Sequence, residues 1–308
     1  SKDMLMDLQM PTYMGTSGND NSKLRAPMGN YGHIRNTGLE LTLNTHPLIG
    51  NFQWDSEFQI SWNKNKLIAL NGTASSAIMG YAQWGSTLVS LSDTGESLYS
   101  FYGYVTDGIY QDLADLQTSP KPVKYPANGV FDGANTVYVG DIKYKDLNGD
   151  GVINENDRTN IGSPMPKFTF GWNNTFRYKG FDLSVLFQGA AGAYIWYSGD
   201  LVWPFARFSN VLADVKGNYW SKDNTPAQNA KVDYPRMTSD SNPNNYQASS
   251  YWTRSSDYIR LKNLEIGYSL PEAFCKRMGM AGCRFYLTGE NLITWDKLSL
   301  IHISEPTR

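Results

Sequence analysis

The segment Phe52-Gln53-Trp54-Asp55-Ser56-Glu57-Phe58-Gln59-Ile60-Ser61-Trp62 decides the fold class. Except at Ser56, bulky apolar residues alternate with polar or ionisable ones. Because successive side chains of a β-strand point to opposite faces, this pattern predicts a strand with one apolar and one polar face. The segment also has about the length, 9 to 11 residues, that a tilted strand needs to cross a bilayer.

The same alternation recurs along the chain. Its apolar positions are Leu39, Leu41 and Leu43, then Phe168, Phe170, Trp172, Phe176 and Tyr178, then Phe181, Leu183, Val185 and Phe187, and finally Phe285 and Leu287. Between the last two groups, the apolar positions start with Ile259 and Leu261 and continue with Leu264, Ile266 and Tyr268. The alternation is therefore shifted by one residue, which predicts a bulge about Lys262 and Asn263. We therefore expect an all-β protein with many two-faced strands.

Composition agrees with many strands joined by turns, because 308 residues include 20 Tyr, 13 Phe, 9 Trp, 28 Gly and 14 Pro. The net charge of -2 gives no electrostatic argument for a nucleic-acid partner. No apolar run approaches the roughly 18 residues of a membrane helix, whereas the strands of a membrane barrel alternate and average to polar.

The predicted connections differ in length. The links at 178–181, 44–51 and 271–282 are short or moderate, whereas 112–166 and 189–256 are long and rich in Asn, Asp, Ser, Gly and Pro. Short turns at one end and long loops at the other are typical of an outer-membrane barrel. A soluble sandwich or jelly roll also alternates. Aromatic residues at strand ends and charges on strand after strand favour the barrel.

One connection contains a calcium-loop pattern, Asp146-Leu147-Asn148-Gly149-Asp150-Gly151-Val152-Ile153-Asn154-Glu155-Asn156-Asp157. The predicted ligands are the side chains of Asp146, Asn148, Asp150, Asn154 and Asp157 and the carbonyl of Val152. The flanks read as strands, so an EF-hand is not expected. The alternative is a solvated Asn/Asp/Gly turn. A structural Ca²⁺ ion is the prediction.

Few residues suit catalysis. His33 and His46 remain once the C-terminal residues are set aside, and no compact His, Cys and carboxylate cluster appears. An esterase or glycosidase would need a nucleophile motif or paired carboxylates, and Asp132 and Asp141 read only as acidic loop residues. Cys275 and Cys283 flank a turn and leave two alternatives, a disulfide or two apolar thiols. The chain is not expected to be an enzyme.

Both ends bear on the domain prediction. The start, Ser1-Lys2-Asp3-Met4-Leu5, has no basic stretch followed by an apolar core, so no signal peptide is expected there. The last residues, 298–308, read as the translation of a sequencing adapter rather than as native protein. We therefore expect 1–297 to be a C-terminal portion of a barrel.

Several motifs resemble the SusC/RagA family of TonB-dependent outer-membrane transporters. They are Asn36-Thr37-Gly38-Leu39-Glu40-Leu41, Trp62-Asn63-Lys64-Asn65-Lys66, Gly140-Asp141-Ile142-Lys143-Tyr144-Lys145-Asp146-Leu147-Asn148-Gly149-Asp150-Gly151, Ile161-Gly162-Ser163-Pro164-Met165-Pro166, Tyr258-Ile259-Arg260-Leu261-Lys262-Asn263-Leu264 and Gly289-Glu290-Asn291-Leu292. The resemblance implies a large antiparallel transmembrane β-barrel of roughly 22 strands, incomplete here. It also implies a Gram-negative outer membrane, TonB contacts through a region outside this sequence, and import of oligosaccharides or peptides under a SusD-like lipoprotein lid.

The family's loops would meet the lid and the substrate. Trp196, Tyr197, Trp203, Tyr219 and Trp220 are the predicted substrate-binding residues, since aromatic rings stack on sugar faces. The alternative is that these rings pack the loops. The competing interpretation of the whole chain is a calcium-dependent carbohydrate-binding surface protein without transport.

Overall fold

The computed structural model describes residues 4–7, 28–70, 78–81, 88–123, 137–197, 202–203, 211–238 and 242–298. Nearly all the residues expected to come from an adapter lie outside this part of the chain. The chain divides into two compact units. The sheet unit comprises 36–65, 165–194 and 255–308, and the connection unit comprises 1–35, 66–164 and 195–254.

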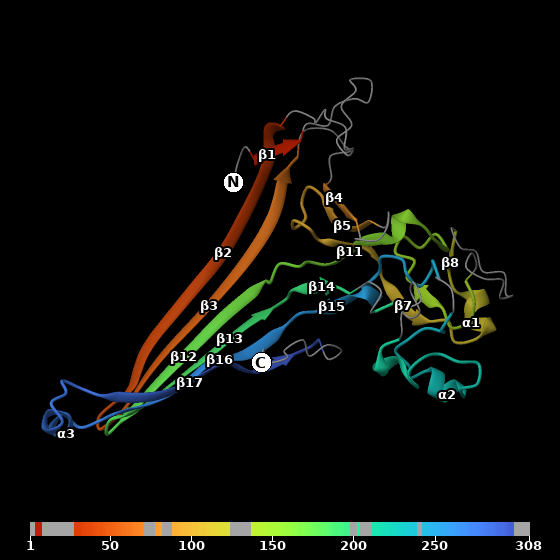
Figure 1. The fold of residues 1–308 in the computed structure, drawn as a ribbon. Coiled ribbons are helices and arrows are strands. Elements are labelled where there is room, and N and C mark those ends of the chain that lie inside the picture. The colour runs from red at the N-terminus through yellow and green to blue at the C-terminus, as the bar shows by residue number, and fades with distance from the viewer. Residues whose placement is uncertain are drawn as a thin grey trace, which may run out of the picture. The chain divides into compact units, whose positions relative to one another are not determined.

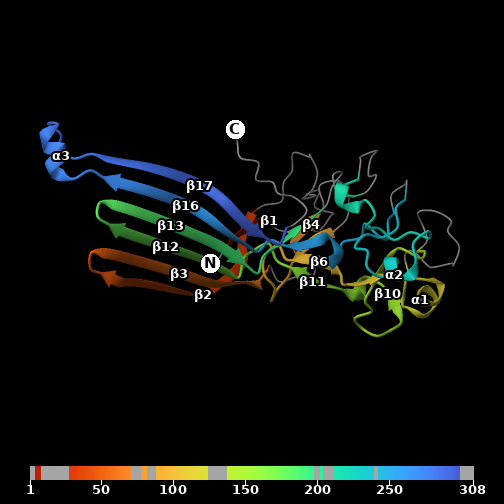
Figure 2. The ribbon, with the colours of Figure 1, turned by 90° about the horizontal axis from the view of Figure 1, so that it is seen from below.

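A seven-stranded antiparallel sheet carries the predicted alternation (Figures 1 and 2). In spatial order its strands are β1 (Met4–Asp7), β2 (Met28–Ile49), β3 (Phe52–Ala69), β12 (Phe168–Tyr178), β13 (Phe181–Ala191), β16 (Tyr258–Ser269) and β17 (Arg284–Asp296). Neighbours in the sheet are neighbours in sequence except at β3–β12 and β13–β16, where a long connection intervenes. All-β architecture is thereby confirmed.

The register keeps like residues opposite one another. Along β3 and β12 the facing pairs include Trp62 with Phe168, Ile60 with Phe170, Phe58 with Trp172, and Trp54 with Phe176. The apolar row continues across β13, β16 and β17 through Leu183, Ile266 and Leu287. A slip of one residue would move every side chain to the other face, so this matching holds the register.

Two local features set the geometry of the strands. β12 and β13 are joined by Lys179 and Gly180, which both have positive φ, 46° and 84°, as a tight hairpin turn requires. The bulge predicted near Lys262 is confirmed, because Leu186 faces Asn263 while Phe187 faces Leu261, leaving Lys262 as the extra residue.

The link expected at 44–51 is shorter than predicted, because β2 runs on to Ile49 and β3 begins at Phe52. The link at 271–282 contains helix α3 (Glu272–Arg277).

The long connections also differ from their predicted bounds. The first connection, 70–167, starts well before residue 112, and the second, 192–257, starts after β13 ends at Ala191. The first contains β4 (Ile78–Tyr81), β5 (Leu88–Ser92), β6 (Phe101–Tyr104), β7 (Thr106–Ile109), α1 (Leu113–Thr118), β8 (Lys121–Pro122), β9 (Ile142–Tyr144), β10 (Val152–Ile153), η2 (Glu155–Asp157) and β11 (Arg158–Gly162). The second contains β14 (Tyr194–Trp196), η4 (Ala213–Val215), α2 (Pro226–Asn229), η5 (Ser250–Trp252) and β15 (Thr253–Ser255).

The connection unit has its own buried core. One cluster joins Tyr104, Ile142, Tyr144 and Ile153, and a second joins Tyr110, Leu116, Val137 and Val139. A third joins Ile34, Leu67 and Leu70. The parts of the long connections that the structure describes are therefore folded rather than open loops. In the part of the chain that the structure describes, no helix is long and apolar enough to span a membrane.

Candidate functional site

One face of the sheet is a broad apolar surface. Its residues stand on adjacent strands and are largely exposed, with Leu39 70% and Ile266 50% accessible. Aromatic rings gather near the short β12–β13 turn, where the Phe181 and Tyr268 ring centroids are 4.4 Å apart. Such a face needs a covering medium, because large contiguous apolar patches are rare on protein surfaces that meet water.

Two polar side chains interrupt this apolar face, and each has a tryptophan partner. Ser56 and Asn174 face each other across β3 and β12. The Trp54 indole donates to Asn174 Oδ1 at 3.0 Å, and the Trp172 indole donates to Ser56 Oγ at 2.9 Å. Hydrogen-bonded polar groups can be placed in an apolar medium at a much lower free-energy cost than unpaired ones.

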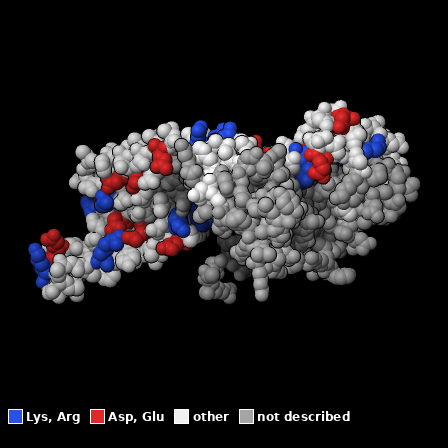
Figure 3. Space-filling model, turned by 90° about the horizontal axis from the view of Figure 1, so that it is seen from above, with Lys and Arg blue, Asp and Glu red and all other residues white. Residues whose placement is uncertain are grey.

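The opposite face carries paired charges. Asp55 accepts hydrogen bonds from His46 Nδ1 and from Arg177 Nη1, both at 2.6 Å. Next along the sheet, Arg284 donates to Asp182 and to Glu265. On the face drawn in Figure 3, acidic and basic side chains lie side by side over the strands.

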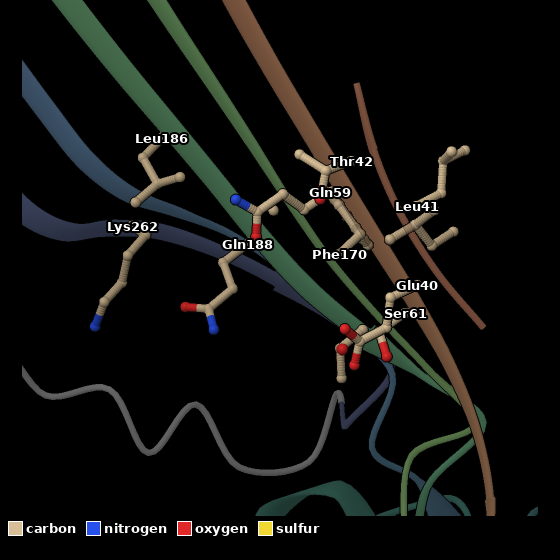
Figure 4. Close-up of a pocket in the computed structure, with 12 residues that line it drawn as sticks. Glu40, Leu41, Thr42, Gln59, Ser61, Phe170, Leu186, Gln188 and Lys262 are labelled. Carbon is tan, nitrogen blue, oxygen red and sulfur yellow. The ribbon is translucent and has the colours of Figure 1, made fainter. Parts of the chain in front are cut away.

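A hollow of about 490 Å³ lies against the polar face of the sheet unit. Its lining includes Glu40, Gln59, Gln188 and Lys262, the last at the bulge. Figure 4 shows Gln188 and Lys262 projecting on the same side of the sheet. The lining residues offer both hydrogen-bond donors and acceptors. They include no pair of carboxylates of the kind that a glycosidase uses.

The predicted calcium ligands all lie in one tight loop. Asp146 accepts hydrogen bonds from the main-chain N–H groups of Gly149 and Gly151 at 2.6 and 2.7 Å. Gly149 and Gly151 have φ of 77° and 81°, the left-handed conformation that glycine adopts without strain. These contacts curl the loop around the Asp146 carboxylate.

Two further carboxylates of this loop are also held in place. Hydrogen bonds from the Asn148 side chain and the Val152 N–H lower the pKa of Asp150, which keeps its carboxylate ionised. Asp157 is buried, and its two oxygens accept from the N–H groups of Leu147 and Asn154 at 2.8 Å each.

Oxygen-rich side chains, a curled main chain and the ionised Asp150 carboxylate suit a hard cation. The arrangement also has a feature that fits less well, since Asn148 Nδ2 donates to Asp150 Oδ2 at 2.9 Å while its Oδ1 accepts from the Asp150 N–H at 3.0 Å. Among the described residues, no group of three or more His, Cys, Asp or Glu side chains has the arrangement of a metal site. Calcium binding stays a prediction.

The five predicted substrate-binding aromatic residues are distributed through the connection unit. Trp196 lies 6.2 Å from the Phe101 ring, and Trp203 stacks on Tyr246 with centroids 4.9 Å apart. Burial raises the pKa of Tyr246 to about 12, so its hydroxyl stays neutral.

The remaining three of these residues sit among other side chains of the unit. Tyr197 is only 9% exposed, so little of its ring is open to a substrate. Trp220 packs against the cluster around Tyr110, and Tyr219 bridges Tyr234 through the main chain. Their packing against neighbours was the alternative considered above, whereas substrate binding by any of them stays a prediction.

The two cysteines are both free thiols, with Cys275 buried in α3 and Cys283 partly exposed. Asp141, interpreted from the sequence only as an acidic loop residue, is fully buried and pairs with Arg236 at 2.7 Å. The two residues belong to different long connections, so nothing in the local sequence signalled the pair.

The sequence of the chain is similar to those of several known proteins. It is 31% identical over 302 residues to TonB-dependent receptor P3 of Formosa agariphila, covering 96% of this chain and 27% of the relative. It is 24% identical over 272 residues to TonB-dependent receptor SusC of Bacteroides thetaiotaomicron, covering 85% of this chain and 23% of SusC. No protein-family model matches.

A solved structure described as the RagAB peptide transporter has the same fold, with a TM-score of 0.68 and 20% identity. The match covers 96% of this chain and 28% of that chain. The chain thus spans roughly a quarter of the length of the proteins it matches. By sequence similarity over nearly its whole length, the chain is similar to the TonB-dependent receptors, SusC among them, and it has the fold of part of their β-barrel.

Proposed function

We propose that this chain is part of an outer-membrane transporter of a Gram-negative bacterium that imports oligosaccharides or peptides with energy from TonB. The observation that carries the proposal is the two-faced sheet, with exposed apolar side chains on one side and paired charges on the other. A strand that is apolar toward lipid and polar toward the lumen is the pattern of a membrane barrel.

Lipid is the covering medium that best suits the apolar face. Without lipid, water would contact an apolar patch that runs across β3, β12, β13, β16 and β17. The aromatic rings near the β12–β13 turn, including Phe181 and Tyr268, suit a membrane interface, where aromatic girdles occur. The relatives are receptors and transporters by name, and none of those reported is named as an enzyme.

A SusD-like lipoprotein is the proposed lid, and the connection unit is its proposed docking surface. Support comes from the likeness to SusC and to the RagAB structure. The substrate would meet rings such as Trp196 and Trp203, because aromatic faces stack on sugars and on apolar peptide side chains. TonB contacts would lie in a region outside this sequence.

The test is uptake by a complete protein that carries this sequence, expressed in a host with and without TonB. We expect fluorescently labelled oligosaccharides or peptides to enter only when TonB is present, and a SusD-like lipoprotein to co-purify. A matched control is a protein lacking the second connection, which should insert in the membrane but lose the lipoprotein. Uptake that is independent of TonB would contradict the proposal.

The alternative is a calcium-dependent carbohydrate-binding surface protein without transport. It shares the acidic loop and the aromatic rings but needs no lipid-facing surface. Fractionation separates the two: a transporter stays with outer membranes after a high-salt wash, whereas a surface-bound protein is released.

We also propose that the loop from Asp146 to Asp157 binds Ca²⁺ to rigidify the connection unit rather than to take part in chemistry. Support comes from the ionised Asp150 and the main chain curled about Asp146. If the ion binds, Asn148 turns its amide so that the oxygen faces the cation. The ion would screen the repulsion among the carboxylates of the loop.

A further inference from the structure

The carboxylate of Asp141 is a fully buried acceptor of five hydrogen bonds. Arg236 donates to it twice, from Nε at 2.7 Å and from Nη2 at 3.0 Å. Asn242 and Asn245 donate their side-chain amides at 2.8 and 3.1 Å, and the Tyr138 N–H donates at 2.8 Å. Four of the five bonds come from the second connection, whereas Asp141 belongs to the first.

The segment that donates to Asp141 also completes β9. The Ile142 N–H donates to Asn245 Oδ1 at 2.8 Å, and Asn244 Nδ2 donates to the Ile142 carbonyl at 3.0 Å. The Tyr144 hydroxyl donates to the Asn244 carbonyl. Side-chain amides thus take the place of a neighbouring strand on this short edge, where unpaired main-chain groups would be costly.

A third set of contacts extends the junction. The Arg236 N–H donates to the Gly140 carbonyl at 2.7 Å, and the Trp252 indole donates to the Asn245 carbonyl at 2.7 Å. The Arg236 guanidinium also lies 5.9 Å from the centre of the Tyr138 ring. All these residues belong to the connection unit, so the junction is internal to one compact body.

We propose that Asp141 is a clasp that couples the two long connections, so that they open as one cooperative unit rather than as two independent loops. Removing the charge would take the anionic acceptor of two hydrogen bonds from the Arg236 guanidinium, and removing one member of a buried ion pair is strongly destabilising. An amide in place of the carboxylate would also point a donor toward other donors. The coupling concerns the fold of the unit and does not rest on transport.

The competing account is that Asp141 only stabilises its own turn through the Tyr138 N–H. The two accounts differ in which residues the Asp141 carboxylate stabilises. A turn-stabilising carboxylate affects residues 138–144 alone, whereas a clasp also affects 242–252 in the second connection.

Hydrogen exchange with mass-spectrometric detection on a complete barrel in detergent tests the clasp. With Asp141→Asn we expect exchange to become about a hundredfold faster in both 142–144 and 242–252, because the amides report the same opening. The control is Asp223→Asn, an exposed acid in the same unit, for which exchange in both segments should stay within about twofold of the parent protein.

A milder variant keeps the test informative if the Asp141→Asn protein fails to fold. Asn242→Ala removes one donor to the carboxylate, and we expect exchange about tenfold faster in both segments, the size of one hydrogen bond to a charged group. If either variant speeds exchange only in 138–144, or if the two segments respond by clearly different factors, the clasp is wrong.

Discussion

The indole nitrogen of Trp54 donates a 3.0 Å hydrogen bond to Oδ1 of Asn174 across two adjacent strands, on the apolar face of the sheet. Asn174 is only 5% exposed. Apart from Ser56, which faces it, the amide lies in an apolar row, so the bond explains how this polar residue is tolerated there.

Replacing Trp54 by Phe should lower the free energy of unfolding by about 1–3 kcal/mol, because it leaves the Asn174 amide without its donor. The measurement is the denaturant midpoint of a complete barrel in detergent. The double variant Trp54→Phe, Asn174→Leu is the control and should regain most of the loss, since two apolar groups leave nothing unpaired. A double variant as unstable as the single one would mean that packing, not the hydrogen bond, sets the effect.

The two faces of β3 should respond oppositely to the same substitution. Ile60→Arg places a cation on the apolar face and should cost about 2–4 kcal/mol at mid-membrane. Gln59→Arg, one residue away on the face that lines the hollow, should be tolerated. Denaturant unfolding in lipid vesicles measures both, and equal losses would refute the assignment of the lipid face on this strand.

Gly140→Ala should disrupt the connection unit. Gly140 has φ of 91°, and an added Cβ would lie 2.4 Å from Cε3 of Trp220 and 2.9 Å from Cβ of Arg236. Conformational strain and overlap together should cost about 2–4 kcal/mol.

Gly108 provides a matched control for that substitution, because it has the same φ of 91° with open space around its Cβ position. Gly108→Ala should therefore cost only the strain, about 1–2 kcal/mol. Thermal melting followed by near-UV circular dichroism compares the two. Indistinguishable melting shifts would show that the Trp220 contact is unimportant.

Calorimetric titration tests the acidic loop. We expect Ca²⁺ to bind a complete barrel weakly, with a Kd on the order of 0.1–1 mM, since Asp157 takes the place of the usual glutamate. The double variant Asp146→Ala, Asp150→Ala should lose the heat of binding, whereas Glu155→Gln, in the same loop but outside the predicted ligands, should keep it. Identical heats for the parent and the double variant would rule out calcium at this loop.

The connection unit should lose stability in acid partly through Asp115. Burial raises the pKa of Asp115, but hydrogen bonds from the Gln111 N–H, Lys143 and Ser119 outweigh it, so the pKa lies below the usual 3.8. A lowered pKa means that the contribution is present above the unfolded-state value and is lost as pH falls through the folded value.

Melting temperatures measured between about pH 6 and pH 3 should therefore fall less steeply for Asp115→Asn than for the parent protein. Exposed Asp223, replaced in the same way, should leave the slope unchanged. Parallel curves for the parent and Asp115→Asn would show that this carboxylate does not contribute to acid sensitivity.

The strands of the sheet could be predicted because their signal is local. Alternation in 168–178 and 181–188 fixed which face each residue occupies, and the change of register at Leu261 located the bulge. The hairpin at Lys179 and Gly180 followed from the short link between two alternating runs.

The connection unit could not be predicted in the same way. Its strands, such as β8 and β10, are too short for alternation to be distinguished from loop sequence. Asp141 and Arg236 lie far apart in the chain, so their pairing depends on the folded unit. The burial of Tyr197 likewise depends on neighbours that its own sequence does not specify.

The adjacency of β3 and β12 has a consequence for how such a chain can change over evolution. Residues 70–167 leave and return between two neighbouring strands, so their length does not affect the strand register. The entropy of closing a flexible loop grows only logarithmically, and doubling its length costs about 0.6 kcal/mol. Insertions and deletions can therefore reshape the connection while the sheet keeps its pairing, so the connection can diverge on an unchanged frame.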